Sequence, residues 1–185
     1  MNVGILGAGN WSRALATLVA EAGHQPRLGY LDKSLSGIPG TPNLPALAKE
    51  SDLLLIAVSP RKVKTIVRKA KLQPANHVVL ACRGLNPEGG GWLSDIICTE
   101  SAAVRVGVLT GPALATEIVR RRPSALVVAS RFNEVAKRTQ RALHSSICRV
   151  YTSSDILGIE LAGAMVSIIT ITLGLADSIN QGIGV

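Results

Sequence analysis

The chain begins with a short apolar run, a glycine turn and the start of a helix, and this order most constrains its fold. Residues 2–6 have the composition of a buried strand, and Gly7 and Gly9 lie between that strand and a helical pattern that opens at Trp11. Gly7 permits a tight turn, whereas Gly9 lets the backbone approach a pyrophosphate held by the amides and dipole of the helix N-terminus. Ser12 takes the place of the usual third glycine. The arrangement predicts a dinucleotide-binding turn, with an ordinary strand–helix turn of another α/β protein as the alternative.

Apolar runs and helical patterns alternate along most of the chain. Strands are predicted at residues 2–6, 26–30, 53–58, 77–82, 104–109, 124–129 and 149–151. Helices are predicted at residues 11–22, 61–71, 112–121 and 133–143, and residues 34–45, rich in Gly, Pro and Ser, are predicted to be a loop. The strands are continuous runs of Val, Ile and Leu, which suits strands covered on both faces. We therefore expect an α/β fold with a doubly wound, Rossmann-type parallel sheet.

The C-terminal segment has a different character. Residues 155–180 read as one long helix, and residues 161–176 within it are almost entirely uncharged. A membrane span needs about 20 apolar residues; this run is shorter and is flanked by Glu160 and Asp177, so we expect no span. A helix that is apolar all round belongs inside a larger domain or in an interface. We expect either a truncated C-terminal domain or a homo-oligomer formed through residues 159–179.

Composition narrows the function classes. Much of the net charge of +8 lies on residues 61–71, where apolar residues at helical spacing leave a basic outer face. Only 3% of residues are aromatic, so the side chains that accompany a nucleic-acid-binding surface are missing, and we expect no nucleic acid partner. The three cysteines, Cys82, Cys98 and Cys148, match neither a disulfide framework nor a metal site. No charged segment precedes the first strand, so we expect a cytoplasmic protein without a signal peptide.

Five motifs occur in order along the chain. They are Gly7-Ala8-Gly9-Asn10-Trp11, Ala57-Val58, Arg83-Gly84-Leu85, the segment Leu-Thr-Gly-Pro-Ala-Leu-Ala-Thr-Glu at residues 109–117, and residues 149–152 with residues 158–164. Together they resemble the NAD(P)-dependent glycerol-3-phosphate dehydrogenases over essentially the whole chain. The resemblance implies a dinucleotide-binding domain at residues 1–152. It implies that residues 153–185 hold the first helix of an all-α substrate and dimerisation domain, which would be truncated here.

The resemblance also implies a reaction and a set of contacts. The family interconverts dihydroxyacetone phosphate and glycerol 3-phosphate by hydride exchange with NAD(P)H. By resemblance, the residues that bind the cofactor are Gly7, Gly9, Asn10, Trp11, Leu31 near the adenosine ribose, Arg83, Ala115, and Glu117 near the nicotinamide. The residues that bind the substrate are Arg83, Gly111 and Ala113. The cofactor is NAD or NADP: Asp32 suits a ribose hydroxyl, whereas Lys33 and Arg13 slightly favour a 2′-phosphate.

The catalytic residues of the family are not all present in this chain. Val166 stands where the family has its catalytic lysine, and valine can neither accept a proton nor polarise a carbonyl. Losing a positioned acid or base typically costs about 10²–10⁴ in rate. Arg83 replaces a second family lysine and keeps its charge, but a guanidinium does not give up its proton. We expect no catalytic residue and little or no activity. The alternatives are a Rossmann pseudoenzyme, serving as cofactor sensor or assembly partner, and a reductase for another substrate that uses Arg83 and Glu117.

Overall fold

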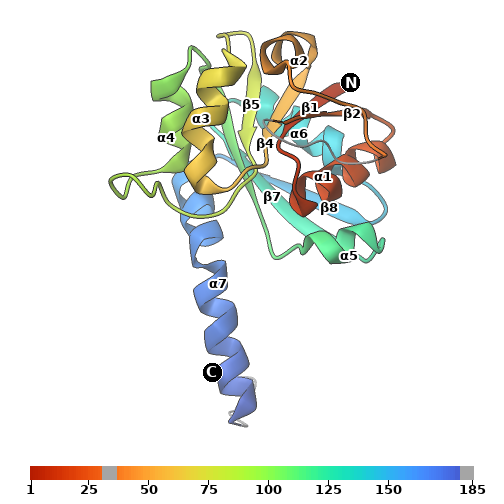
Figure 1. Cartoon of the computed structure of the whole chain (residues 1–185). Helices are drawn as coiled ribbons and strands as arrows, with labels where there is room; N and C mark the ends of the chain where they lie inside the picture. The colour runs from red at the N-terminus through yellow and green to blue at the C-terminus, as the bar shows by residue number, and fades with distance from the viewer. Residues whose placement is uncertain (31–36, 180–185) are drawn as a thin grey trace.

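The computed structural model describes residues 1–30 and 37–179, which form a single eight-stranded sheet with helices on both faces (Figure 1). The strands are β1 (Asn2–Leu6), β2 (Gln25–Gly29), β3 (Gly40–Thr41), β4 (Leu53–Ile56), β5 (His77–Leu80), β6 (Arg105–Thr110), β7 (Ser124–Ser130) and β8 (Cys148–Ser153). The helices are α1 (Asn10–Glu21), α2 (Leu44–Glu50), α3 (Pro60–Ala70), α4 (Leu93–Glu100), α5 (Ala115–Val119), α6 (Asn133–Leu143) and α7 (Ile156–Ser178). The strand order is β3-β2-β1-β4-β5-β6-β7-β8, which places β1 inside the sheet. The predicted doubly wound fold is confirmed.

The core lies in two layers, one on each face of the sheet. Successive side chains of a strand point to opposite faces: Leu55 joins the layer under α1 and α6, whereas Leu54 joins the layer under α3 and α4. Val79 and Val78 of β5 divide in the same way. This double burial is the reason why the strand sequences are continuously apolar instead of alternating.

Most predicted elements lie within two residues of the observed ones, but five elements differ from the prediction. Helix α5 is shorter than the predicted helix at residues 112–121, and α2 and α4 were not predicted. Strand β3 and the start of α2 fall inside the predicted loop at residues 34–45, part of which lies outside the described residues. Asn43 begins α2 by accepting a hydrogen bond from the amide of Ala46 at 3.2 Å, a capping signal masked by the surrounding loop-like composition. Strand β7 runs antiparallel to β6, whereas a parallel sheet was predicted. The direction could not be predicted because a buried apolar run carries no information about strand direction.

Helix α7 projects away from the sheet domain (Figure 1). Its first turns pack on the domain through the buried residues Glu160 and Gly163, whereas most side chains from Ser167 onward are exposed. By length and composition it is the one helix of the described chain able to cross a membrane, and 11% of its most apolar stretch is buried. The expectation of no membrane span therefore stays a prediction.

Candidate active site

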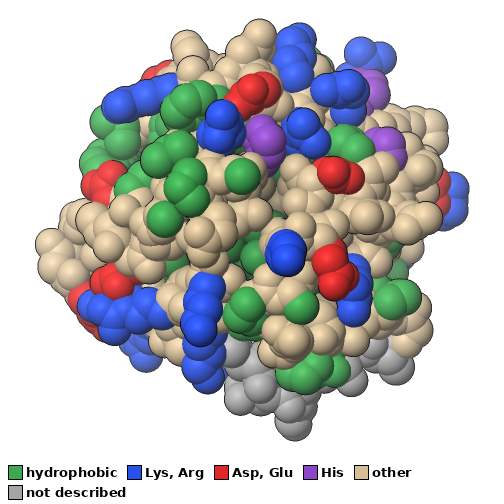
Figure 2. Space-filling view, turned by 90° about the horizontal axis from the view of Figure 1, so that it is seen from above, with side chains coloured by type: hydrophobic (Ala, Val, Ile, Leu, Met, Phe, Trp, Pro, Cys, Tyr) green, Lys and Arg blue, Asp and Glu red, His purple; other side chains and the backbone are tan. Residues whose placement is uncertain are grey.

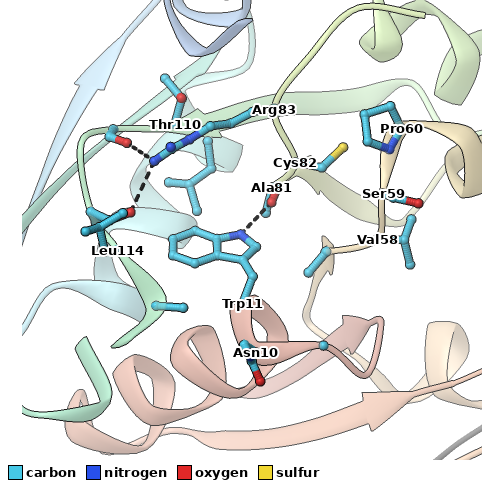
Figure 3. Close-up of a pocket in the computed structure, with 16 residues that line it drawn as sticks. Asn10, Trp11, Val58, Ser59, Pro60, Ala81, Cys82, Arg83, Thr110 and Leu114 are labelled. Atoms are coloured by element: carbon cyan, nitrogen blue, oxygen red, sulfur yellow. Dashed lines mark hydrogen bonds between the residues drawn. The ribbon is translucent and has the colours of Figure 1, made fainter. Parts of the chain in front are cut away.

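A cavity of about 480 Å³ opens where β4, β5 and β6 end and where α1, α3 and α5 begin (Figure 3). Its lining is formed by Gly9, Asn10, Trp11, Ala57, Val58, Ser59, Pro60, Ala81, Cys82, Arg83, Leu109, Thr110, Gly111, Ala113, Leu114 and Ala115. Helices α1 and α3 cover opposite faces of the sheet, so the cavity lies at the point where the chain switches faces. In open α/β sheets this switch point is where ligands bind.

The two glycines of the first turn have different roles. Gly7 has a φ of +145°, and a Cβ there would lie 2.3 Å from the carbonyl oxygen of Ala57 and 2.7 Å from Oγ of Ser12. The fold itself therefore requires this glycine. Gly9 has an ordinary φ of −98°, and a Cβ there would meet no protein atom within 4 Å. The space over Gly9 is open, as close approach of a ligand to the backbone requires.

The N-terminus of α1 is available to an anion. Gly9 is its N-cap and provides no side-chain cap, and the first turn carries no acidic residue. Its first amides therefore lack helical partners and lie at the positive end of the helix dipole. Ser12, in the position of the third glycine, is buried and donates a hydrogen bond to the carbonyl of Ala57 at 3.2 Å. The serine is thus accommodated beneath the turn, outside the cavity.

The side chain of Trp11 connects the start of α1 to the residues that follow β5 by a hydrogen bond. Its indole Nε1 donates a hydrogen bond to the carbonyl of Ala81 at 2.6 Å, and its ring forms part of the cavity wall (Figure 3). Asn10 lies beside it at the edge of the cavity. Three of the residues predicted to contact the cofactor, Gly9, Asn10 and Trp11, therefore lie in the same wall of the cavity.

Arg83 contacts the two other residues predicted to bind the substrate, Gly111 and Ala113. Its Nη2 donates hydrogen bonds to the carbonyl of Gly111 and, at 3.1 Å, to that of Ala113 (Figure 3). Within the described chain no carboxylate forms an ion pair with this guanidinium. Burial lowers the pKa of Arg83, but a guanidinium remains protonated at neutral pH. Among the described residues, Arg83 is therefore the fixed cation of the cavity, and it is hydrogen-bonded to the backbone after β6.

The titratable side chains of the described cavity wall are poorly suited to proton transfer near neutral pH. Among the lining residues in the described part of the chain, Cys82 and Arg83 are the titratable ones. Burial, reinforced by the charge of Glu160, raises the pKa of the Cys82 thiol to about 12. Neither group gains or loses a proton near neutral pH, so the described part of the wall offers binding groups and a cation but no general base.

Among the described residues, three predicted site positions are absent from the cavity lining: Gly7, Glu117 and Val166. Glu117 lies on α5 and accepts a hydrogen bond from Arg122 at 3.0 Å, beside a separate, shallower cavity. Val166 is half-buried on α7 and is absent from the lining. Leu31 falls outside the described residues. Ala115, in contrast, lines the cavity.

Several lining residues were not predicted individually. They include Ser59, Pro60, Cys82, Thr110 and Leu114, which follow or end strands β4, β5 and β6. Their position at the carboxyl ends of parallel strands is the signal that identifies them. Thr110 also contacts α7: a Cβ on Gly163 would lie 2.6 Å from its Oγ1, so a glycine is needed where α7 crosses the end of β6.

Comparisons with known proteins agree with this geometry. The sequence profile described as NAD-dependent glycerol-3-phosphate dehydrogenase N-terminus matches residues 30–136. The glycerol-3-phosphate dehydrogenase (NAD(P)+) of Thioalkalivibrio sulfidiphilus is 32% identical over 97% of this chain and 61% of its own length. That of Trichormus variabilis is 36% identical over 96% of this chain and 57% of its own length.

Solved structures extend the likeness to the fold. The crystal structure of glycerol-3-phosphate dehydrogenase from Coxiella burnetii matches with a TM-score of 0.84 and 26% identity, covering 98% of this chain and 62% of that chain. The yeast enzyme matches with a TM-score of 0.81 and 19% identity, over 98% of this chain and 64% of its own. The chain spans about three fifths of the length of these curated and structural relatives.

Proposed function

This chain belongs to the family of NAD-dependent glycerol-3-phosphate dehydrogenase N-terminal domains, and from that premise we propose that it is the NAD(P)(H)-binding domain of an oxidoreductase. Its relatives are named as dehydrogenases of glycerol 3-phosphate that use NAD(P)+. The proposed reaction interconverts dihydroxyacetone phosphate and glycerol 3-phosphate, and the bound nicotinamide supplies the hydride chemistry. The proposed domain boundary lies at residues 152 and 153, between β8 and α7.

The observation that carries the proposal is the open space above the backbone of Gly9. This residue lines the cavity at the N-terminus of α1, which has no side-chain cap. A pyrophosphate needs close backbone approach, free amides and a positive dipole, and this turn provides all three. Asn10, Trp11 and Ala115 would complete the cofactor contacts, since all three line the same cavity. The residues present therefore fit NAD or NADP.

Arg83 is the proposed anchor for the substrate. Glycerol 3-phosphate is dianionic, and a guanidinium binds phosphate and carbonyl oxygens through charge-assisted hydrogen bonds. Nη2 of Arg83 is engaged with Gly111 and Ala113, which fixes the direction of the guanidinium while Nε and Nη1 remain as donors for a ligand. This arrangement supports substrate binding between β5 and β6.

We propose that the chain has little or no dehydrogenase activity. Val166 provides no proton-transfer group at the position of the family lysine, and the described cavity wall supplies no replacement. Cys82 remains a neutral thiol near neutral pH, because its pKa is raised to about 12. The proposed protein therefore keeps the groups that bind cofactor and substrate without the group that transfers a proton.

The binding proposal is tested by filling the space above Gly9. In a Trp92→Phe background, Trp11 is the remaining tryptophan and lies in the cavity, so its fluorescence reports on NADH and NADPH titrations. Gly9→Val should weaken cofactor binding by at least about tenfold while the protein folds normally, because its φ and surroundings accept a side chain.

Gly91→Val is the matched control. A Cβ on Gly91 also meets no atom within 4 Å, and Gly91 does not line the cavity. This variant should bind cofactor as the parent does. The proposal fails if the parent shows no saturable binding below about millimolar cofactor, or if the two valine variants bind alike.

A second candidate function is that of a non-catalytic cofactor sensor or assembly partner. The observation in its favour is the apolar surface of α7: Ile168, Ile171 and Leu175 are 62%, 72% and 64% exposed. Beyond Gly163, residues 164–178 span about 22 Å, less than the ~30 Å of a bilayer core. This length favours a protein partner, and we propose a homo-oligomer through residues 159–179.

Light scattering tests the oligomer proposal. Ile171→Ser should shift the oligomer toward monomer, because it places a hydroxyl in the apolar contact. Phe132→Ser, which alters an apolar residue that is 40% exposed elsewhere on the domain, should leave the molar mass unchanged. A parent protein that is monodisperse and monomeric would remove the support for assembly through α7.

A further inference from the structure

The side chains of His77, Arg105 and Glu134 meet at the amino ends of β5 and β6, at the end of the strands opposite the cavity, and Arg138 lies on the helix that packs there. His77 begins β5, Arg105 begins β6, and the two are partners in the strand register. Glu134 and Arg138 lie four residues apart on α6 and therefore share a helix face. Oε1 of Glu134 lies 2.5 Å from Nε of Arg105 and 3.5 Å from Nε2 of His77.

The charges of this group do not balance. Arg105 and His77 lie against the carboxylate of Glu134, and Arg138 adds a second guanidinium whose charge acts on His77. Arg105 is engaged with Glu134 and also donates a hydrogen bond to the carbonyl of Pro74 at 2.9 Å. Nε of Arg138 is buried and has no hydrogen-bond partner among the described residues. Buried donors without a partner are rare in folded proteins, and each calls for an explanation.

The charge of Arg138 reaches His77. Burial is the main cause that lowers the pKa of His77, and the positive charge of Arg138 is the next, while the charge and the hydrogen bond of Glu134 oppose them. Arg105 also lowers this pKa. The imidazole thus faces a net positive surrounding that an incoming anion would neutralise. Figure 2 views the molecule from this end and shows Lys, Arg and His side chains gathered on it, with few acidic side chains among them.

We propose that His77, Arg105 and Arg138 form a binding site for a small tetrahedral oxyanion, of the class of inorganic phosphate or the phosphate group of a phosphomonoester. The half-buried guanidinium of Arg138, whose Nε has no partner among the described residues, donates to one oxygen, and protonated His77 donates to another. Arg105 adds charge from the neighbouring strand. Glu134 already occupies part of the positive field, so binding is weak while its carboxylate stays in place.

This site is separate from the cofactor cavity. From His77 to Ala81, which lines that cavity, β5 advances about 13 Å at ~3.3 Å per residue. The proposal therefore stands independently of the function assigned to the cavity. Saturating NADH should leave oxyanion binding at His77 unchanged.

Histidine NMR provides a local readout. The probe is sulfate, which keeps its charge across the pH range. A titration with chloride at matched ionic strength is the control, and phosphate is a second probe. The His77 ring resonance, assigned by its loss in His77→Gln, should shift and saturate. Binding should tighten as pH falls from about 8 to about 5, because His77 gains its proton while Arg138, Arg105 and Glu134 face it.

Three variants of α6 separate a site from a general surface effect. Arg138→Gln should weaken sulfate binding by at least about tenfold, whereas Glu134→Gln should strengthen it by about tenfold. Misfolding cannot produce the second result. Lys137→Gln is the matched control: it removes one positive charge from the adjacent, exposed position and should bind sulfate as the parent does.

Three outcomes would overturn the proposal. In the first, Arg138→Gln and Lys137→Gln bind sulfate equally well. In the second, the resonances of His24 and His144 shift together with that of His77 without saturation, which identifies general screening. In the third, NADH displaces sulfate from His77.

Discussion

Glu160 connects α7 to the sheet domain, and its replacement gives the sharpest test of how the domain is held together. The residue is 3% exposed. Its Oε1 accepts hydrogen bonds from the amides of Leu93 and Ser94 at 2.6 and 3.2 Å, and its Oε2 accepts one from Oγ of Ser94 at 2.6 Å. Trp92, the N-cap of α4, supplies no side-chain cap. A carboxylate distant in sequence therefore caps this helix and meets the positive end of its dipole.

The cost of Glu160→Ala follows from these three contacts. Each buried donor left without a partner costs about 1–3 kcal/mol. Water can reach part of a helix end once the side chain is gone, so we expect a loss of about 3–5 kcal/mol from a total of roughly 5–15 kcal/mol. For a domain of this size this corresponds to a fall in Tm of roughly 6–20 °C.

Glu160→Gln separates the hydrogen bonds from the charge. Its amide oxygen can still accept from the amides of Leu93 and Ser94, so mainly the charge–dipole interaction is lost, at about 1 kcal/mol. Glu88→Ala is the control, because Glu88 is an acidic residue whose side chain is 67% exposed in its ion pair with Lys64, and such pairs contribute about 0–1 kcal/mol.

Thermal unfolding followed by circular dichroism gives the order of stability, and hydrogen exchange gives its location. We expect the Tm to fall most for Glu160→Ala, and the amides of Leu93 and Ser94 to exchange faster in that variant. The reasoning is refuted if Glu160→Ala is no less stable than Glu88→Ala, or if exchange at these two amides does not change.

Three further predictions concern the turn, the missing lysine and pH. Gly7→Ala should lower the free energy of unfolding by at least about 2 kcal/mol, measured by urea denaturation, because its Cβ would collide with the carbonyl of Ala57; a neutral effect would contradict this tight turn geometry. In assays of NAD(P)H oxidation by dihydroxyacetone phosphate, the parent should show almost no turnover and Val166→Lys should exceed it by about 10²–10⁴; a parent as active as the lysine variant would disprove the proposed inactivity. Because the pKa of His77 is lowered in the folded state, its contribution to stability is full above about pH 6.5 and is lost as pH falls through the folded pKa. Urea midpoints at about pH 7.5 and pH 5.5 should therefore fall more in the parent than in His77→Gln, and equal decreases would exclude this role.

Part of the candidate site was accessible from sequence because it is local. Gly9, Asn10 and Trp11 are neighbours in one strand–turn–helix unit, and that unit reveals both the turn and its ligand chemistry. The contact of Arg83 with Gly111 was not accessible in this way, because it joins segments 28 residues apart. The position of Glu117, paired with Arg122 beside a different cavity, also depends on how α5 packs.

The sequence by itself determined most of the alternation of strands and helices, the first strand with its glycine turn, and the long apolar helix at residues 156–178. These features follow from hydrophobic periodicity and backbone freedom, which act over a few residues. Only the tertiary structure decided the direction of β7, the capping of α4 by Glu160 and the meeting of His77 with Glu134. Each of these depends on which distant segments become neighbours, and charge, burial and hydrogen-bond partners are set by those neighbours.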